Sequence, residues 1–205
     1  MLLAACVIGS GIMAERLAGP NAALALLANT LATVAALGCL ITLFGPISGA
    51  HFNPIVSAVA CKSGEMDART AALYGAAQIA GCCGGAVLAN LMFELPAIHT
   101  STHVRSGTAQ WLSEVVATAG LVLVVFRSPS INAAAVRVSL WIGAAYWFTA
   151  STSFANPAIT IGRALSDTFA GIRPMDVPGF IAAQIAGGVV GVLLLRVFAD
   201  RRSPA

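Results

Sequence analysis

The sequence predicts an all-α membrane protein: a single domain over residues 1–205, with six transmembrane helices and two re-entrant half-helices in two inverted repeats. Composition is the first reason, because the 205 residues are 58% hydrophobic and only 9% charged. A soluble domain has roughly 25% charged residues. The second reason is an internal repeat, and the third is a pair of Asn-Pro sequences in apolar surroundings.

The few charges and cysteines exclude several other classes of protein. A net charge of +3, scattered along the chain, does not indicate binding of nucleic acid. The C-terminal Arg196, Arg201 and Arg202 are typical of the flank of a membrane span. The cysteines lack His or acidic partners at ligand spacing, so we predict no metal site and no cofactor. These cysteines are Cys6, Cys39, Cys61, Cys82 and Cys83.

Long apolar segments give the positions of the predicted helices. A spanning helix needs about 20 mostly apolar residues. Five segments meet or approach that length: 22–44, 69–93, 110–127, 134–152 and 177–199. The first segment, 1–14, is too short and lacks the basic residues that begin a signal peptide. We expect a first helix without its N-terminal turns, either because the chain is a fragment or because its true start lies upstream.

Two shorter apolar pieces, 54–61 and 157–165, each begin with a proline that follows an asparagine. Proline suits the first turn of a helix, and asparagine is a favourable N-cap. At about 1.5 Å per residue, a helix of this length crosses only part of a bilayer. Each Asn-Pro pair therefore predicts the start of a half-helix, preceded by irregular backbone.

The internal repeat explains how the two halves are arranged. The motif AAQIAG occurs at 76–81 and at 182–187, an offset of 106 residues, and the two Asn-Pro pairs are 103 residues apart. Two matches in the same order indicate a duplicated unit, about 1–95 and 108–200. Each unit holds three spans, and an odd number of spans inverts the second copy in the membrane. Both half-helices should then point their N-termini at the midplane.

The distribution of Lys and Arg predicts a multi-pass protein of the cell (inner) membrane with both termini cytoplasmic. With the C-terminus inside, seven basic residues lie on the cytoplasmic side: Lys62, Arg69, Arg127, Arg137, Arg196, Arg201 and Arg202. Four lie on the other side: Arg16, Arg105, Arg163 and Arg173.

The segments before each Asn-Pro pair predict a passage through the membrane. Irregular backbone at membrane depth is stable only where it is buried in protein or lines a watery cavity. Each half-helix N-terminus carries roughly half a positive charge, so two that meet oppose any cation. Carbonyls and asparagine amides can bind a passing solute. The arrangement favours neutral hydrogen-bonding solutes and resists protons and cations.

The motifs SGAHFNPI and FANPA, in inverted halves of the chain, resemble the aquaporin or major intrinsic protein (MIP) family. The stretch NPAITIGRALSDTFAGI resembles bacterial aquaglyceroporin-like members associated with arsenic handling. The resemblance implies a homotetramer with a pore in each subunit. It implies pore motifs made of Asn53, Pro54, Ile55, Asn156, Pro157 and Ala158. It implies that a pore is lined by carbonyls of Gly49, Ala50, His51, Thr152, Ser153 and Phe154.

The resemblance also implies that Glu114, Gln78 and Gln184 brace the re-entrant loops. Glu114 lies near a span end, so an interfacial position is the alternative. His51 is expected to brace its loop rather than to handle protons. His99 and His103 lie in a polar connection, and we expect them to be solvated.

Two residues depart from the family pattern. Ile55 stands where the family usually has Ala, and its extra methylenes either crowd the midplane slightly or are a tolerated packing variant. Ile159 stands where an Arg usually forms the outer selectivity filter. Counting from the motifs without gaps gives a filter with no aromatic side chain and no cation: Thr33, Ala144, Ser153 and Ile159.

This filter predicts a wide constriction, and thus passive permeation of water and small neutral solutes such as glycerol, urea or arsenous acid. Arg163, one turn beyond Ile159, either supplies a displaced vestibule charge or lies at the outer surface paired with Asp167. A poorly conducting membrane structural protein and a strict water channel are the alternatives. An enzyme is disfavoured because no acid, base and nucleophile gather at one depth.

Overall fold

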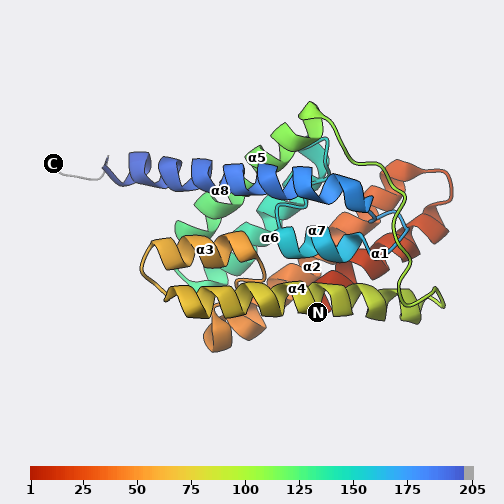
Figure 1. Cartoon of the computed structure of the whole chain (residues 1–205), viewed down its shortest axis with the longest axis horizontal. Coiled ribbons are helices and arrows are strands. Elements are labelled where there is room, and N and C mark those ends of the chain that lie inside the picture. The colour runs from red at the N-terminus through yellow and green to blue at the C-terminus, as the bar shows by residue number, and fades with distance from the viewer. Residues whose placement is uncertain (201–205) are drawn as a thin grey trace.

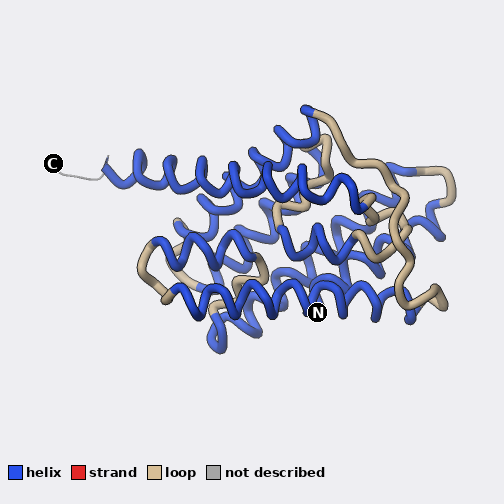
Figure 2. The backbone as a smooth tube through the Cα atoms, in the orientation of Figure 1, coloured by secondary structure: helices blue, strands red, loops and turns tan. Residues whose placement is uncertain are grey.

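The computed structural model describes the backbone of residues 1–200 and the side chains of residues 1–198. The predicted flanking residues Arg201 and Arg202 lie outside the described residues. Within the described range the chain forms eight α-helices (Figures 1 and 2). They are α1 (Leu2–Ala18), α2 (Ala22–Ser48), α3 (Pro54–Lys62), α4 (Ala68–Met92), α5 (Thr108–Phe126), α6 (Ile131–Phe148), α7 (Pro157–Arg163) and α8 (Val177–Asp200).

Four of these helices are long and apolar enough to cross a membrane: α2, α4, α5 and α8 with the 3₁₀ turn that precedes it. The helix α1 has 17 residues and α6 has 18. The predicted span 134–152 is corrected by the structure, because α6 ends at Phe148 and Thr149 turns into extended backbone. Large apolar side chains such as Leu31 and Val189 are more than half exposed, as expected for surfaces that face lipid.

The helices α3 and α7 begin where the Asn-Pro pairs predict. The side chain of Asn53 caps α3 by accepting a hydrogen bond from Ile55 N at 2.9 Å. The side chain of Asn156 caps α7 by accepting from Ala158 N at 3.0 Å and Ile159 N at 3.3 Å. Both half-helices lie between α4 and α8 (Figure 1), and both contact these two helices.

The irregular segments before the half-helices repeat the same backbone geometry. Ala50 and Phe52 have positive φ of 49° and 50°, and Ser153 and Ala155 have positive φ of 49° and 48°. Ala50 and Ser153 are 103 residues apart, and so are Phe52 and Ala155, which is the spacing of the two asparagines. Non-glycine residues rarely adopt this conformation, because the Cβ atom crowds the carbonyl. The two segments therefore share a backbone conformation as well as the Asn-Pro sequence that follows them.

The repeated AAQIAG motif marks a close helix contact in each half. Its last residue in α8 is Gly187, where a β-carbon would lie 2.5 Å from Val115 O in α5. Its last residue in α4 is Gly81, where a β-carbon would lie 3.0 Å from Met1 N. Glycine at this position lets the third long helix of each half pack closely on the first. The glycine of the motif thus serves close packing between helices.

Candidate functional site

A cavity of about 110 Å³ lies between the tips of the two half-helices. Both asparagines line it, together with residues from six of the helices. Those contributions include Val7 (α1), Leu37 (α2), Leu121 (α5), Ile142 (α6) and Ile159 (α7). The two halves of the chain therefore build one site between them.

The two asparagines hold the re-entrant segments together. Asn53 Nδ2 donates to Ala155 O, the residue before Asn156, at 2.7 Å. Asn156 Nδ2 donates to Phe52 O, the residue before Asn53, also at 2.7 Å. Each side chain thus uses its oxygen to cap its own helix and its nitrogen to bind the opposite segment. The asparagine amide that we expected to bind a passing solute therefore also donates a hydrogen bond to a backbone carbonyl of the opposite segment.

The re-entrant segments before the two asparagines form part of the lining of the cavity. Gly49, Ala50, His51, Ser153 and Phe154 line it, whereas Thr152 does not. Among the described residues, no donor forms a hydrogen bond with any of the six predicted carbonyls, those of Gly49–His51 and 152–154. A buried carbonyl without a partner costs free energy, which water or a solute in the cavity can recover.

Glu114 in α5 holds the second re-entrant segment. Its carboxylate is fully buried and accepts hydrogen bonds from Ser151 Oγ at 2.6 Å, Phe154 N at 2.9 Å and Ala155 N at 2.8 Å. Gln184 Nε2 donates to the same carboxylate at 2.6 Å and also to Thr160 Oγ1 at 2.9 Å. These contacts exclude the alternative of an interfacial carboxylate.

The first re-entrant segment is held less firmly. Gln78 Nε2 donates to Ser57 Oγ at 3.0 Å, and Ser57 Oγ lies 3.1 Å from His51 Nδ1. The backbone N–H groups of His51 and Phe52 correspond to those that Glu114 binds in the second half. No acceptor among the described residues pairs with either of them. The two halves share a backbone path but differ in how strongly it is fixed.

The structure places three of the four predicted filter residues on the cavity. Thr33, Ser153 and Ile159 line it, whereas Ala144 in α6 is exposed and does not. Tyr146 lines the cavity instead, with its Oη 3.4 Å from Thr33 Oγ1. Two residues along a helix are a rotation of about 200°, so Ala144 and Tyr146 lie on opposite faces of α6. The cavity thus has an aromatic side chain that is not among the four predicted filter residues, and the filter itself stays a prediction.

Of the two interpretations of Ile55, the contacts favour a packing variant. Its side chain does not line the cavity but packs with Val59 and with Val122 of α5. A β-carbon at Gly188 of α8 would lie 2.7 Å from Ile55 Cγ2. Gly188 thus provides the room for the larger side chain, and Ile55 is a packing variant.

Arg163 lies inside the protein and not at its surface. Only 3% of it is exposed, it lines the cavity, and its Nε donates to Ala170 O. Its guanidinium carbon lies 3.4 Å from the centre of the Phe154 ring, a cation–π contact. Asp167 is bound instead by Thr102, whose backbone N donates to it at 2.7 Å. The alternative of a surface pair with Asp167 is wrong, and the cavity carries a cation outside the four predicted filter residues.

Arg105 is a second buried cation that the sequence did not identify. It lies in the long connection between α4 and α5, and its guanidinium donates to Gly171 O at 2.7 Å and Phe169 O at 3.2 Å. Its Cζ lies 5.1 Å from the same Phe154 ring. Burial lowers the pKa of Arg105 to about 10, so it is charged at neutral pH. Nothing local distinguishes this arginine from a solvated one.

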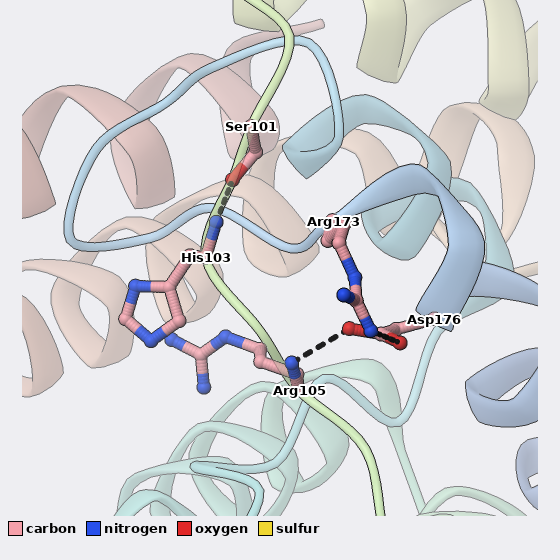
Figure 3. Close-up of polar contacts among 5 residues, drawn as sticks. All are labelled: Ser101, His103, Arg105, Arg173 and Asp176. Carbon is pink, nitrogen blue, oxygen red and sulfur yellow. Dashed lines mark hydrogen bonds and ion pairs between the residues drawn. The ribbon is translucent and has the colours of Figure 1, made fainter.

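The connection that carries Arg105 is fixed by hydrogen bonds (Figure 3). Arg105 N donates to Asp176 at 2.8 Å, and Asp176 also accepts from Arg173 at 2.9 Å. His103 is exposed, as predicted. Partial desolvation of its ring and the nearby charge of Arg105 lower its pKa. His99 is half-buried, and its backbone N donates to Leu165 O at 3.0 Å. The connection therefore closes tightly over one end of the molecule.

Comparisons with known proteins agree with the geometry. The family described as Major intrinsic protein matches residues 1–145. Aquaglyceroporin AqpS of Rhizobium meliloti (strain 1021) is 53% identical over 197 residues, which cover 95% of this chain and 84% of that protein. Aquaporin A of Dictyostelium discoideum is 31% identical over 173 residues, 77% of this chain and 61% of that protein.

The fold is similar to the solved structure of the aquaglyceroporin from Plasmodium falciparum, with a TM-score of 0.68. The match covers 96% of this chain and 90% of that one at 21% identity. The family match extends over more than half of the chain, and the protein is a multi-pass membrane protein of a channel family rather than an enzyme. Two capped half-helices on one cavity and these matches agree: the chain belongs to the major intrinsic protein family.

Proposed function

We propose that the protein is a passive transmembrane channel for water and small neutral solutes, and that the cavity between the half-helices is part of its path. The observation that carries this proposal is one cavity lined by both asparagines and by backbone carbonyls without partners among the described residues. Such carbonyls replace part of the hydration of a passing solute. The similarity to a relative named an aquaglyceroporin supports the same solute class.

The proposed architecture has six crossings, made by α1, α2, α4, α5, α6 and α8, with α3 and α7 entering from opposite sides. We propose that residues 1–95 and 108–200 are inverted repeats. The basic residues favour a cytoplasmic location for both termini. A homotetramer with one pore in each subunit, in the cell membrane, completes the proposal.

Three positive features along the path favour exclusion of cations. The two half-helix N-termini each carry a partial positive charge. Arg163 adds a full charge where it lines the cavity. These charges act in a low-dielectric environment, where they are stronger than in water, and the buried carboxylate of Glu114 offsets only part of them. Protons and metal cations should therefore be rejected while neutral molecules pass.

The polar residues that line the cavity together with Ile159 favour solutes with several hydroxyl or amide groups. Ser153 Oγ is buried and has no hydrogen-bond partner among the described residues. Thr33 and Tyr146 line the same cavity, as do apolar residues such as Leu37 and Ile142. Glycerol, urea and arsenous acid share this pattern of a small neutral body with several hydrogen-bonding groups. We propose this class as the substrates.

Swelling of reconstituted vesicles tests the proposal. Proteoliposomes placed in a glycerol or urea gradient are expected to swell at least about tenfold faster than empty vesicles, because the channel lowers the desolvation barrier. Light scattering measures the rate. Swelling in a sucrose gradient should stay at the level of empty vesicles. Equal glycerol and urea rates with and without protein would refute the solute channel. Fast water flux alone would indicate a strict water channel, and no flux at all a structural protein.

A change at Arg163 tests whether it acts as a barrier to cations. The variant Arg163→Gln is expected to raise methylammonium entry at least about tenfold, because a full positive charge near the path repels a cation by several kcal/mol. Urea flux in the same vesicles reports whether the pore is intact. Arg137→Gln, an exposed charge on α6, is the matched control. Methylammonium entry equal to that of the control would show that Arg163 is only structural.

A further inference from the structure

A second hollow lies on the outside of the molecule, between α3 and α8. It is an open groove of about 450 Å³, and no residue lines both this groove and the central cavity. Ala58 and Val59 of α3 form one wall, and Ile185, Val189 and Leu193 of α8 form the other. Lys62 and Arg196 complete it at one end.

The α8 wall of the groove is an exposed apolar stripe. Ile185, Val189 and Leu193 are spaced four residues apart, so they lie on one face of the helix. Their exposed fractions are 52%, 56% and 53%. In a multi-pass membrane protein such a face is suited to contact with acyl chains. A groove in that face can bind a single lipid acyl chain.

The length of the groove matches one leaflet of a bilayer. Along α3 it runs from Ile55, beside the central asparagine, to Lys62 at the helix end, about 10 Å at the rise of an α-helix. Along α8 it runs from Ile185 to Arg196, about 16 Å. Half of a bilayer core is about 15 Å thick. One end therefore lies near the midplane and the other near the headgroups.

The headgroup end carries two cations and the rest of the groove carries none. Lys62 and Arg196 are exposed. Within the described side chains the single ion pair is that of Arg173 and Asp176, so neither groove cation pairs with a described carboxylate. Lys and Arg side chains at a membrane surface attract anionic headgroups, each contributing about fivefold in affinity.

We propose that this groove binds an anionic phospholipid, with one acyl chain between α3 and α8 and the phosphate between Lys62 and Arg196. This inference depends on insertion in a membrane and not on which solute the pore conducts. Because Ile55 ends the groove and directly follows Asn53 and Pro54, a bound chain contacts the half-helix that carries the first pore asparagine.

Lipid titration of the purified full-length protein in detergent tests the proposal. Phosphatidylglycerol is expected to raise the Tm and to remain bound in native mass spectra, whereas phosphatidylcholine with the same chains should bind much more weakly. The double variant Lys62→Gln/Arg196→Gln should weaken phosphatidylglycerol binding by about 30-fold. Arg69→Gln, an exposed charge outside the groove, is the matched control and should bind like the native protein.

A groove-filling variant tests the acyl-chain part. Ala58→Trp is expected to reduce phosphatidylglycerol binding at least about tenfold while the Tm without lipid stays close to the native value, because Ala58 is exposed. Three results would overturn the proposal. They are unchanged phosphatidylglycerol binding in both variants, equal stabilisation by inorganic phosphate alone, and an altered oligomeric mass of Ala58→Trp with lipid binding intact, which would assign the groove to a second copy.

Discussion

Replacing Glu114 with alanine is expected to abolish solute flux and to lower the Tm by 10 °C or more. The carboxylate is fully buried and accepts four hydrogen bonds, three of them from the second re-entrant segment. Each donor left unpaired costs about 1–3 kcal/mol, so the change removes several kcal/mol. That is a large part of the roughly 5–15 kcal/mol that stabilises a folded domain.

Thermal unfolding in detergent and vesicle swelling measure the two effects of this change. Glu114→Gln keeps the shape but replaces one acceptor oxygen by a donor that faces other donors, so we expect an intermediate loss. Val116→Ala, an exposed position on the same helix, is the control and should change the Tm little. A Tm of Glu114→Ala equal to that of Val116→Ala would contradict the role that we assign to this carboxylate.

Replacing Asn156 with alanine is expected to reduce glycerol flux at least about tenfold. The change removes the cap of α7, worth about 1 kcal/mol, and the bond to Phe52 O. Asn156→Asp keeps the capping oxygen but loses the donor and places a negative charge at the meeting point of two positive helix ends. We therefore expect that Asn156→Asp, unlike Asn156→Ala, admits methylammonium.

A double-mutant cycle tests whether the two asparagines act as one unit. Because each binds the residue beside the other, Asn53→Ala and Asn156→Ala should be non-additive in Tm. The double variant should lose clearly less than the sum of the single losses. Strict additivity, together with unchanged cation exclusion in Asn156→Asp, would falsify the reciprocal arrangement as the basis of selectivity.

The parts of the structure that follow local rules could be predicted from the sequence. Asparagine followed by proline predicts a capped helix start whatever surrounds it, and both half-helices begin at these pairs. Apolar length predicts the long helices in the same way. The repeat of AAQIAG aligns the halves because a close helix contact needs glycine at the same place in each.

The parts that depend on side-chain direction or on distant backbone could not be predicted. Tyr146 lines the cavity and Ala144 does not, a difference that spacing along the chain did not predict, since helical faces rotate by about 100° per residue. Arg105 acquires its role from carbonyls that lie 64 and 66 residues away in sequence. The direction of Ile55 depends on Gly188, a residue of the other repeat. Each of these contacts exists only after the chain has folded.

The reciprocal asparagine bonds also limit when the two re-entrant segments can join during synthesis of the chain. The side chain of Asn53 donates to Ala155 O, 102 positions later in the chain. Phe52 O accepts from Asn156, 104 positions later. Contacts this distant close last, because the intervening chain must first be ordered. While the ribosome is still adding the second half, the first re-entrant segment has no partner for its central side chain. The two re-entrant segments can therefore be joined only after the second of them has been made, so the cavity between the asparagines is completed late in assembly.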